Sequence, residues 1–391
     1  MSLATEPAPS APGRKAAPPR VAMVGAGQLA RMTHQAAISL GVELRVLANS
    51  ESDPAVRAGA EHIIGSYRDI DDLRNLAAGC DVLTFDHEGV PVEHLTALEQ
   101  QGINLNPGAA SKRLAQDKLH SREVLTDLGF PTPPWTFAST PEDFRSFTSH
   151  HGWPVVAKAP RGGYDGRGVW MIESLGEACE LLDGSTDGFI IEPLVNIERE
   201  LAVLIVRSTG GERASYPVVE TIQRDAMCRE IHAPAPVSSK VSARATAMAS
   251  EIAAVTGATG VLAVEFFLTP DGLLVNELAL RPHNSGHFTI EGCVTSQFEQ
   301  HLRAVLGLPL GLPSLIAPAV STFNIVGQPD GTDPRSQLER VLEVPGAHVH
   351  LYGKSPRPGR KLGHVTVCGQ DPEPVREAAR LAAATLERSR S

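Results

Sequence analysis

Apolar residues between positions 21 and 105 fall into short runs that alternate with longer stretches of helical spacing. The runs VAMVG, VELRVLA and DVLTF have the length and composition of buried strands. The stretches that follow them predict helices at 28–40, 69–78 and 92–101. Strands that alternate with helices in this way predict an α/β domain, in which helices wrap a parallel sheet.

A different pattern begins near residue 129. A helix-rich passage at 109–128 ends at Gly129 and a run of prolines, which indicates a domain boundary. Beyond it, PVVAK, GVWMI, GFIIE, ELAVLIV and ASYPVV predict strands, and an alanine-rich segment predicts a helix at 238–256. From about residue 316, STFNIV, HVHLY and HVTV with a helix at 374–388 predict a small strand-rich module.

These changes in the pattern of apolar residues divide the chain into several parts. A division is expected, because 391 residues exceed what a single hydrophobic core usually supports. A Pro- and Ala-rich start without a hydrophobic signal core predicts a disordered tail. No apolar stretch approaches about 18 residues, so no membrane span is predicted. The predicted parts are the tail at 1–19, an α/β domain at 20–125, an α+β domain at 126–310 with subdomains at about 126–195 and 196–310, and a C-terminal domain at 311–391.

Two glutamates interrupt apolar runs, Glu265 in VLAVEFFL and Glu277 in LLVNEL. The intervening Thr-Pro-Asp-Gly predicts a hairpin with a three-residue loop, in which residue 269 faces 273 and Glu265 faces Glu277. Two carboxylates so placed repel each other unless a cation neutralises them. Because magnesium prefers hard oxygen ligands shared with water and phosphate, the pair indicates a magnesium–nucleotide site. The alternative is that one glutamate faces solvent on an edge strand.

The net charge of −10 argues against nucleic acid or an anionic membrane as the main partner. Any phosphate chemistry therefore requires local clusters of Arg and Lys. The five cysteines are scattered singly, which is typical of reduced residues in a cytoplasmic protein and of neither a zinc site nor a disulfide framework.

Gly25-Ala26-Gly27 follows a predicted strand and opens a predicted helix. Backbone amides in such a turn can meet a phosphate or another anion at the helix N-terminus. A dinucleotide fingerprint would need glycine where the chain has Ala30, and an acidic ribose ligand after the second strand. An NAD-linked oxidoreductase is therefore disfavoured, and a plain tight turn stays an alternative.

The segment 161–168, RGGYDGRG, lies between the strands PVVAK and VWMI. Four glycines between two strands predict a flexible flap whose backbone can approach phosphates, while Arg161 and Arg167 add positive charge. Lys158, on the strand beneath, is placed to pair with phosphate oxygens. An ordinary hairpin is the alternative.

Three further groups carry candidate chemistry. The strand end at 192–195, with Glu200, suits an adenine and a ribose diol, although surface charges explain both glutamates equally well. Arg281, His283 and Asn284 emerge beyond the proposed metal site and could hold a small oxyanion, whereas His287 could be a satisfied structural histidine. Lys354, Arg357, Arg360 and Lys361 form the densest basic cluster, which suits a substrate phosphate or is solvated surface charge.

Together, GAGQLARM, RGGYDGRG, ELALRPHNSGH and RPGRKLGH resemble the ATP-grasp superfamily, and within it the 5-(carboxyamino)imidazole ribonucleotide synthetase family of purine biosynthesis. The resemblance implies an N-terminal pre-ATP-grasp (Rossmann-like) domain, a central ATP-grasp domain of two subdomains, and a small C-terminal β-rich domain. It also implies a cytoplasmic homodimer whose partners are small molecules: ATP, bicarbonate and aminoimidazole ribonucleotide.

The resemblance implies roles for individual residues. ATP is expected at Arg113, Lys158, Gly163, Tyr164, Asp165, Gly166, Arg167, Gly168, Val169, Glu192, Pro193, Leu194, Val195, Glu200, Asn276 and Glu277. Magnesium, or manganese in its place, is expected at Glu265 and Glu277. The ribonucleotide is expected at Gln28, Leu29, Glu88, Tyr164, Asp165, Arg167, Lys354, Arg360 and Lys361. Asp165 is expected to orient or deprotonate the substrate amine, and Arg281, His283 and Asn284 to hold bicarbonate.

The implied reaction is attack of bicarbonate on the γ-phosphate of ATP to give carboxyphosphate. The substrate amine then captures carboxyphosphate, or CO2 released from it in place. A formate-dependent glycinamide ribonucleotide transformylase and a non-catalytic nucleotide sensor are the alternatives. HNSGH and GQL argue against the first, and the Arg281, His283 and Asn284 group against the second. The chain departs from the family pattern at Gln223, where a histidine is usual, and at Asp86-His87-Glu88, where Glu-x-Glu is common.

Overall fold

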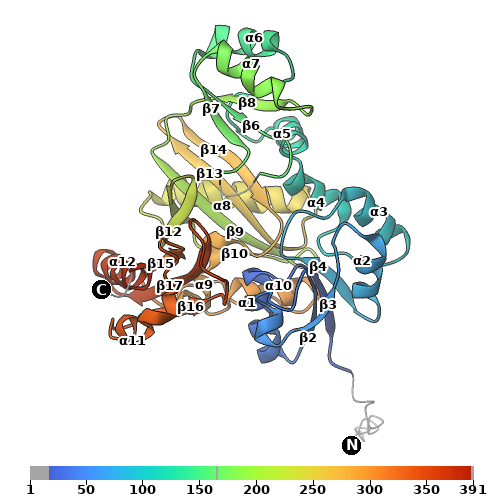
Figure 1. Ribbon diagram of the computed structural model, residues 1–391, viewed down its shortest axis with the longest axis vertical. Coiled ribbons are helices and arrows are strands. Elements are labelled where there is room, and N and C mark those ends of the chain that lie inside the picture. Colours follow the sequence, from blue (N-terminus) through green and yellow to red (C-terminus); the bar gives the residue numbers. More distant parts are fainter. Residues whose placement is uncertain (1–16, 164–165, 389–391) are drawn as a thin grey trace, which may run out of the picture.

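The computed structural model describes residues 17–163 and 166–388 of the chain (Figure 1). Its N-terminal part is a parallel sheet with the strand order β3-β2-β1-β4. Alternate residues of β1 face two separate cores, since Val21 and Met23 pack with Ala30, while Ala22 and Val24 pack with Leu73. The predicted α/β domain is thereby confirmed, although β3 and the short 3-10 helix η1 were not predicted. The elements are β1 (Arg20–Val24), α1 (Gln28–Leu40), β2 (Glu43–Ala48), η1 (Val56–Ala58), β3 (Glu61–Ile64), α2 (Ile70–Ala77), β4 (Val82–Phe85) and α3 (Val92–Gln100).

A small antiparallel sheet forms a separate lobe, at the top of Figure 1. Its strand order is β5-β8-β6-β7, and two helices cover one face. Along β6, Val155 and Ala157 pack against these helices, whereas Val156 and Lys158 line the cleft on the opposite face. The elements are α4 (Ala109–Gln116) and α5 (Lys118–Asp127), which lead into the lobe, then β5 (Thr136–Ala138), α6 (Pro141–His151), β6 (Val155–Lys158), β7 (Val169–Ile172), α7 (Leu175–Asp183) and β8 (Phe189–Pro193).

The central sheet is antiparallel and has nine strands, in the order β14-β13-β9-β11-β12-β15-β17-β16 with β10 paired to β9. Pairing of β12 with β15 joins the C-terminal strands to it, so the module predicted from residue 311 extends the same sheet. The expected strand ASYPVV is divided in two around Pro217, which has no backbone N–H to donate. The strands are β9 (Arg199–Arg207), β10 (Arg213–Ser215), β11 (Val219–Arg224), β12 (Met227–Ala233), β13 (Gly260–Thr269), β14 (Gly272–Ala279), β15 (Ala319–Val326), β16 (His348–Leu351) and β17 (Lys361–Gly369).

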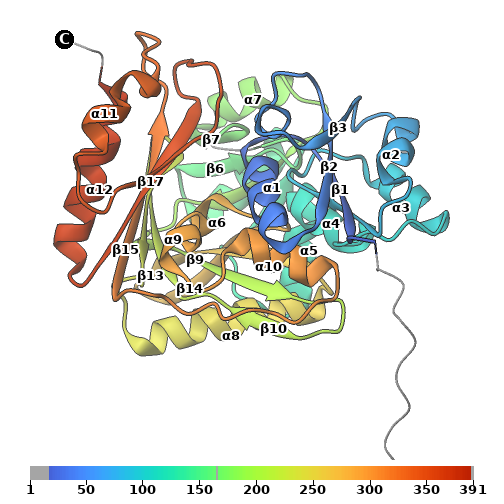
Figure 2. The same cartoon turned by 90° about the horizontal axis from the view of Figure 1, so that it is seen from below.

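Helices cover this sheet at both ends, as Figure 2 shows for α8 and α12. Met248 and Ile252 of α8 pack on Val264 of β13, and Ala379 of α12 packs on Phe323 of β15. The helices are α8 (Ser239–Val255), η2 (Asn284–Gly286), α9 (Thr289–Gly292), α10 (Gln297–Val305), η3 (Pro334–Gln337), α11 (Leu338–Val341) and α12 (Pro372–Glu387).

Helix α10 fixes the N-terminal part against the central sheet. Its Leu302 and Val305 enter the core beneath β1 and α1. The buried His301 accepts a hydrogen bond at Nδ1 from Val261 N (3.2 Å), so its Nε2 donates to Thr84 Oγ1 at 2.8 Å. One neutral imidazole thus joins α10 to strands of two sheets.

This arrangement makes stability depend on pH. Burial lowers the pKa of His301 from 6.5 to about 3, and burial likewise lowers the pKa values of His283, His287 and His364. A base whose pKa falls on folding gains its proton only in the unfolded chain, so stability is lost as pH falls below 6.5. Glu265, whose pKa burial and Glu277 raise to about 7, acts in the opposite direction.

We therefore expect a net loss of stability between pH 6.5 and pH 5, because four buried histidines outweigh one glutamate. Each proton contributes up to about 1.4 kcal/mol per pH unit. Thermal unfolding across this range measures the trend, and NMR titration should show that the His301 ring stays neutral at pH 5. A ring that titrates near pH 6.5 would contradict the assignment.

Candidate active site

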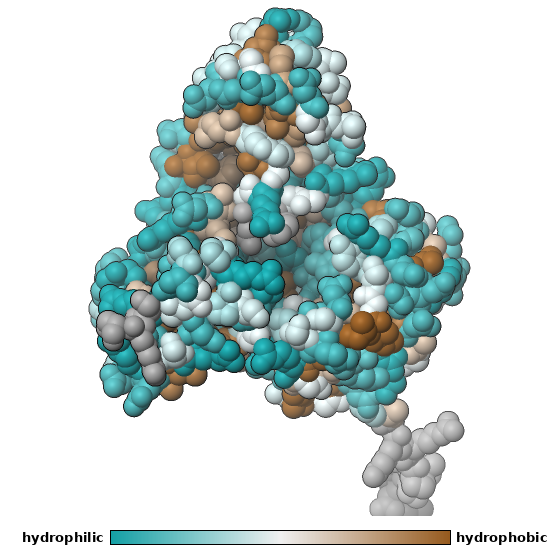
Figure 3. Space-filling view, viewed as in Figure 1, coloured by the Kyte–Doolittle hydropathy of each residue, from teal (hydrophilic) through white to brown (hydrophobic). Residues whose placement is uncertain are grey.

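An open cavity of about 1850 Å³ lies where the N-terminal part, the small lobe and the central sheet meet. Figure 3 shows this face hollowed between the lobes. Arg167 and Gly168 do not line the cavity, and Tyr164 and Asp165 lie outside the described residues. The predicted site residues that line it are Gln28, Leu29, Glu88, Arg113, Lys158, Gly163, Gly166, Val169, Glu192, Pro193, Leu194, Val195, Glu200, Glu265, Asn276, Glu277, Arg281, His283, Asn284, Lys354, Arg360 and Lys361.

Glu265 and Glu277 face each other across β13 and β14, as predicted, but by a different register. Thr269 pairs with Gly272, so the loop has two residues and the predicted three-residue loop is wrong. A bulge after Glu265 then leaves Asn276 as an extra residue on β14, and this shift brings the two glutamates opposite each other. The pairing of the carboxylates is confirmed, although the register predicted for it was wrong.

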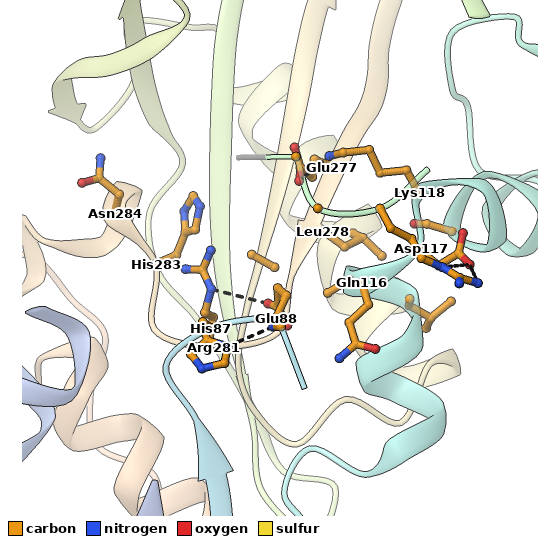
Figure 4. Close-up of a pocket in the computed structure, with 18 of the residues that line it drawn as sticks. His87, Glu88, Gln116, Asp117, Lys118, Glu277, Leu278, Arg281, His283 and Asn284 are labelled. Atoms are coloured by element: carbon orange, nitrogen blue, oxygen red, sulfur yellow. Dashed lines mark hydrogen bonds and ion pairs between the residues drawn. The ribbon is translucent and has the colours of Figure 1, made fainter. Parts of the chain in front are cut away.

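The two carboxylates show the electrostatic strain expected of like charges. Burial, and then the charge of Glu277, raises the pKa of Glu265 to about 7. Lys118 Nζ lies 2.6 Å from Glu277 Oε1 and neutralises part of the pair (Figure 4). The sequence did not predict Lys118, since it stands at the start of a helix 159 positions before its partner. The oxygen donors and excess negative charge fit a divalent cation such as magnesium.

Beneath the flap, Glu192 is sandwiched between two cations. Lys158 Nζ lies 2.6 Å from Glu192 Oε2 and donates to Asn276 Oδ1 at 3.2 Å. Arg122 Nε lies 2.8 Å from Glu192 Oε1. Burial on its own would raise the pKa of Glu192, but Lys158 and Arg122 hold it below the usual value. Glu192 is only 2 % exposed, so the surface-charge interpretation of this residue is wrong, and the sequence offered no signal for Arg122.

The base of the flap is tied to the start of α5. Asp117 Oδ2 accepts hydrogen bonds from Arg161 Nη2 (2.7 Å) and Nε (3.0 Å), while its Oδ1 accepts from His120 N at the helix N-terminus. Gly166 has φ 76°, and a Cβ at this position would lie 2.3 Å from Ala226 Cβ in the turn between β11 and β12. Glycine is therefore required here both by the backbone and by the close approach.

Arg281, His283 and Asn284 follow β14 and lie along one wall of the cavity (Figure 4). Ser285 N donates to His283 Nδ1 at 3.3 Å, so the ring proton is on Nε2, which lies 3.7 Å from Glu265 Oε1. Burial holds the pKa of His283 well below its usual value. Both polar atoms of the Asn284 side-chain amide are buried, and neither makes a hydrogen bond within the described part of the chain. This wall offers donors to a small oxyanion.

Glu88 connects this wall to the N-terminal part. Its carboxylate contacts Lys112 Nζ, accepts from Leu280 N at 3.2 Å, and lies 3.5 Å from Arg281 Nε. Lys112 is fully buried and donates to His87 O at 3.0 Å, an arrangement that the sequence did not predict. Arg281 is thereby positioned by a carboxylate from another domain.

The glycine turn has an anion of its own. Gly27 N donates to Asp86 Oδ2 at 2.8 Å, and a Cβ at Gly25 would lie 1.7 Å from Asp86 Oδ1. The sequence left open which anion the turn binds. In the structure, the Gly27 amide binds the carboxylate of Asp86, a side chain of the protein itself.

The basic C-terminal loop reaches the same cavity. Lys354 Nζ contacts Gln28 Oε1 at the start of α1, and Arg57 Nη1 donates to Gly353 O at 2.7 Å. Arg360 Nη1 donates to Ser355 O at 3.2 Å, which shapes the loop itself. These contacts bring Lys354, Arg360 and Lys361 to the end of the cavity lined by Gln28 and Leu29.

The charge of Lys118 leads to a prediction. Removing it in Lys118→Met should destabilise the metal-free protein more at pH 8, where Glu265 is ionised, than at pH 6, where it is protonated. Thermal unfolding at both pH values measures the difference, with Lys240→Met on the exposed face of α8 as the control. An equal loss at both pH values would mean that Lys118 does not offset the repulsion.

None of the helices among residues 17–163 and 166–388 has the length and apolar character needed to cross a bilayer.

Three family descriptions match successive parts of the chain. Residues 19–116 match the ribonucleotide synthetase preATP-grasp domain, residues 123–298 the ATP-grasp domain, and residues 321–378 the phosphoribosylaminoimidazole carboxylase C-terminal domain. The matches cover the three parts that surround the cavity.

Similar proteins match this chain over most of their length. The N5-carboxyaminoimidazole ribonucleotide synthase of Mycobacterium tuberculosis is 47% identical, over 95% of this chain and 89% of that protein. The enzyme of the same name from Corynebacterium ammoniagenes is 45% identical, over 93% of this chain and 91% of that protein. The structure of N5-carboxyaminoimidazole synthase from Aspergillus clavatus, in complex with ADP and 5-aminoimidazole ribonucleotide, superimposes with a TM-score of 0.87 at 32% identity, covering 95% of this chain and 100% of that one.

Proposed function

The chain belongs to the N5-carboxyaminoimidazole ribonucleotide synthase family, and we propose that its cavity brings together ATP, bicarbonate and 5-aminoimidazole ribonucleotide. The protein is an ATP-grasp ligase that carboxylates 5-aminoimidazole ribonucleotide to N5-carboxyaminoimidazole ribonucleotide in purine biosynthesis. The proposal concerns which residues of this chain bind each reactant and what each residue does.

One observation carries the assignment. The paired carboxylates, the oxyanion wall (Arg281, His283 and Asn284) and the basic loop (354–361) line a single cavity. Glu265 lies 3.7 Å from His283 Nε2, so the proposed metal site and the proposed bicarbonate site are adjacent. A reaction that joins a phosphoryl group to bicarbonate needs this adjacency, because the reacting atoms must meet within about 3–3.5 Å.

ATP is proposed to lie between the two lobes, with its phosphates beneath the flap. Lys158 and Arg113 would supply positive charge, and the amides of Gly163 and Gly166 would donate to phosphate oxygens. Glu192 to Val195 would meet the adenine by their backbone, and Glu200 would accept from the ribose. In this assignment the side chain of Glu192 holds Lys158 in place at 2.6 Å.

Magnesium, or manganese in its place, is proposed at Glu265 and Glu277, with Asn276 beside them. When bound it would neutralise charge on the transferring phosphoryl group. The protein's own contribution is the fixed carboxylate pair, whose repulsion favours a cation over an empty site.

The oxyanion wall is proposed to hold bicarbonate while one of its oxygens attacks the γ-phosphate. The P–O bond to ADP breaks and carboxyphosphate forms. Arg281 and Asn284 would stabilise the negative oxygens, and neutral His283 would donate from Nε2. Closure of the flap would exclude water that hydrolyses the mixed anhydride.

The ribonucleotide is proposed to bind between the flap and the C-terminal loop. Lys354, Arg360 and Lys361 would hold its phosphate near Gln28 and Leu29, while Glu88 fixes Arg281 on the facing wall. Tyr164, Asp165 and Arg167 would approach the aminoimidazole, with Asp165 orienting or deprotonating the amine that attacks carboxyphosphate. The amine forms the new C–N bond, and phosphate leaves.

The protein is further proposed to be a cytoplasmic homodimer. The resemblance to the family supports both statements, and the single, unpaired cysteines suit a reducing compartment. An apolar patch also supports a subunit interface. Val294, Leu312 and Ile316 are 56%, 64% and 62% exposed and lie on two adjacent segments joined by backbone hydrogen bonds.

The test of the function is release of ADP with ATP, magnesium and bicarbonate, with and without 5-aminoimidazole ribonucleotide. Carboxylated product that depends on both bicarbonate and the ribonucleotide supports the proposal. Turnover with formate and glycinamide ribonucleotide would point to the transformylase, and nucleotide binding without turnover would point to a sensor.

Glu277→Gln keeps the shape of the side chain but removes a charge from the proposed metal site. We expect turnover to be abolished at saturating magnesium while the fold is retained, because the phosphoryl group loses its neutralising cation. Glu251→Gln, on exposed α8, is the matched control. Retention of more than about a tenth of wild-type activity, equivalent to a barrier change below about 1.4 kcal/mol, would count against the site.

Arg360→Ala should raise the KM for the ribonucleotide about ten- to a hundredfold, because a charge-assisted phosphate contact contributes roughly 1.5–3 kcal/mol. The KM for ATP should change little. Steady-state kinetics with each substrate varied in turn measures both, and Arg340→Ala, on the exposed face of α11, is the control. An increase in the KM for ATP would place Arg360 in the nucleotide site instead.

A further inference from the structure

A cluster of imidazoles and one carboxylate lies outside the cavity, between α9 and the β16–β17 hairpin. His350 Nε2 is 2.5 Å from Glu291 Oε1, and the His350 ring stacks on His364 with the ring centroids 4.5 Å apart. The ligand atoms that Glu291, His350 and His364 offer lie within 4.8 Å of one another. The cluster joins α9 to the edge of the central sheet, because α9 packs against β17 (Figure 1).

Two polar atoms of the cluster lack partners. Glu291 Oε2 and His364 Nε2 are buried, and neither makes a hydrogen bond within the described chain. His364 is fully buried. A buried polar atom without a partner is costly, and buried polar atoms in folded proteins nearly always have one. These two atoms therefore indicate a ligand that completes the cluster.

Tyr352 orients the ring of His364. The tyrosine hydroxyl, itself buried, lies 2.8 Å from His364 Nδ1. Imidazoles that bind metals usually donate their other ring N–H to a fixed acceptor, which leaves the second nitrogen for the ion. Burial, together with His287 and His350, holds the pKa of His364 well below its usual value, so the ring is neutral at pH 7. When Nδ1–H donates to the Tyr352 hydroxyl, the neutral ring offers a lone pair at Nε2.

The neighbouring His287 is not a ligand in this arrangement. Gln297 Oε1 accepts from His283 N, so the Gln297 amide nitrogen is a donor and its 3.4 Å contact places a hydrogen toward His287 Nδ1. The proton of His287 is therefore on Nε2. His287 stacks on His364 with ring centroids 4.8 Å apart and flanks the cluster without offering it a lone pair at Nε2.

We propose that Glu291, His350 and His364 bind a divalent transition-metal ion of the zinc type, with water as a fourth ligand. Two imidazoles and a carboxylate are zinc ligands, whereas magnesium and calcium prefer oxygen alone. In a tetrahedral zinc site the ligand atoms lie about 3.3 Å apart. The widest separation in the cluster, at most 4.8 Å, would therefore close by up to about 1.5 Å, and the 2.5 Å between His350 Nε2 and Glu291 Oε1 would open by about 0.8 Å. His350, with 21% of its side chain exposed, provides the way in.

The position of the site indicates a structural role. β16 ends three residues before Lys354, and β17 begins at Lys361. An ion that joins this hairpin to α9 would hold the basic loop in place beside the cavity. The effect on substrate binding rests on the proposed function, but binding of the metal does not.

The test is titration of untagged, metal-stripped protein with Zn²⁺ in competition with a chromogenic chelator, with excess Mg²⁺ present to occupy the carboxylate pair. We expect one tightly bound Zn²⁺ per chain. Glu291→Gln and His350→Gln should each weaken binding at least tenfold, because each removes a ligand. His348→Gln, an exposed residue on the same strand, is the matched control and should bind as the wild type does. Zn²⁺ should also raise the Tm of the wild type, but not of the two ligand variants, by a few degrees.

Wild-type protein that binds no stoichiometric Zn²⁺, or ligand variants that bind it as tightly as the wild type, would overturn the proposal. If a variant fails to fold, the wild type loaded with Co²⁺ decides, since a tetrahedral site gives an intense visible absorption and an octahedral, solvent-like spectrum contradicts the site. A negative result here leaves the ADP-release assay unaffected, so failure of the metal site and failure of the proposed function are distinguishable.

Discussion

The repulsion between Glu265 and Glu277 is the constraint on which the cavity depends. The fold places two carboxylates face to face in a sheet, where burial and mutual charge raise the pKa of Glu265 to about 7. Three lysines nearby each contact a carboxylate, since Lys118 contacts Glu277, Lys158 is held by Glu192, and the buried Lys112 is held by Glu88. Because the acids and bases of the walls are paired in this way, the excess negative charge remains at the hairpin, where a divalent ion would be bound.

The sequence predicted this pair because local chemistry carries the signal. A charged residue inside an apolar strand can be recognised from the sequence alone, and so can a turn, a glycine-rich flap and a basic loop. The bulge at Asn276 was not predicted. The predicted register still paired Glu265 with Glu277, because the loop is one residue shorter than predicted and the extra residue Asn276 offsets this difference. The alternation of short strands and helices likewise predicted most of the N-terminal sheet, since β1, β2 and β4 are buried on both faces. The edge strand β3 has no buried residue, and the pattern did not predict it.

The residues that the sequence did not reveal are those whose meaning depends on distant partners. Arg122 and Lys112 stand in ordinary helices and acquire their roles from Glu192 and Glu88, which are 70 and 24 residues away. The continuation of the central sheet into the C-terminal strands has the same origin, because pairing of β12 with β15 joins segments separated by most of a domain. The pattern of residues along the chain does not record contacts between distant segments, so it predicted a separate C-terminal module.

This continuity of the sheet has a mechanical consequence. The basic loop lies between β16 and β17, at the edge of the same sheet whose other edge carries Glu265 and Glu277. Loops are usually the least constrained parts of a fold, yet this one is held by Arg57 at Gly353 and by Gln28 at Lys354. His287 stacks on His364, and His364 stacks on His350. These three rings connect the region of the oxyanion wall to the β16–β17 hairpin. Packed rings and hydrogen bonds resist displacement, so the two ends of the cavity are held relative to each other. The flap is the part that is proposed to close over bound reactants.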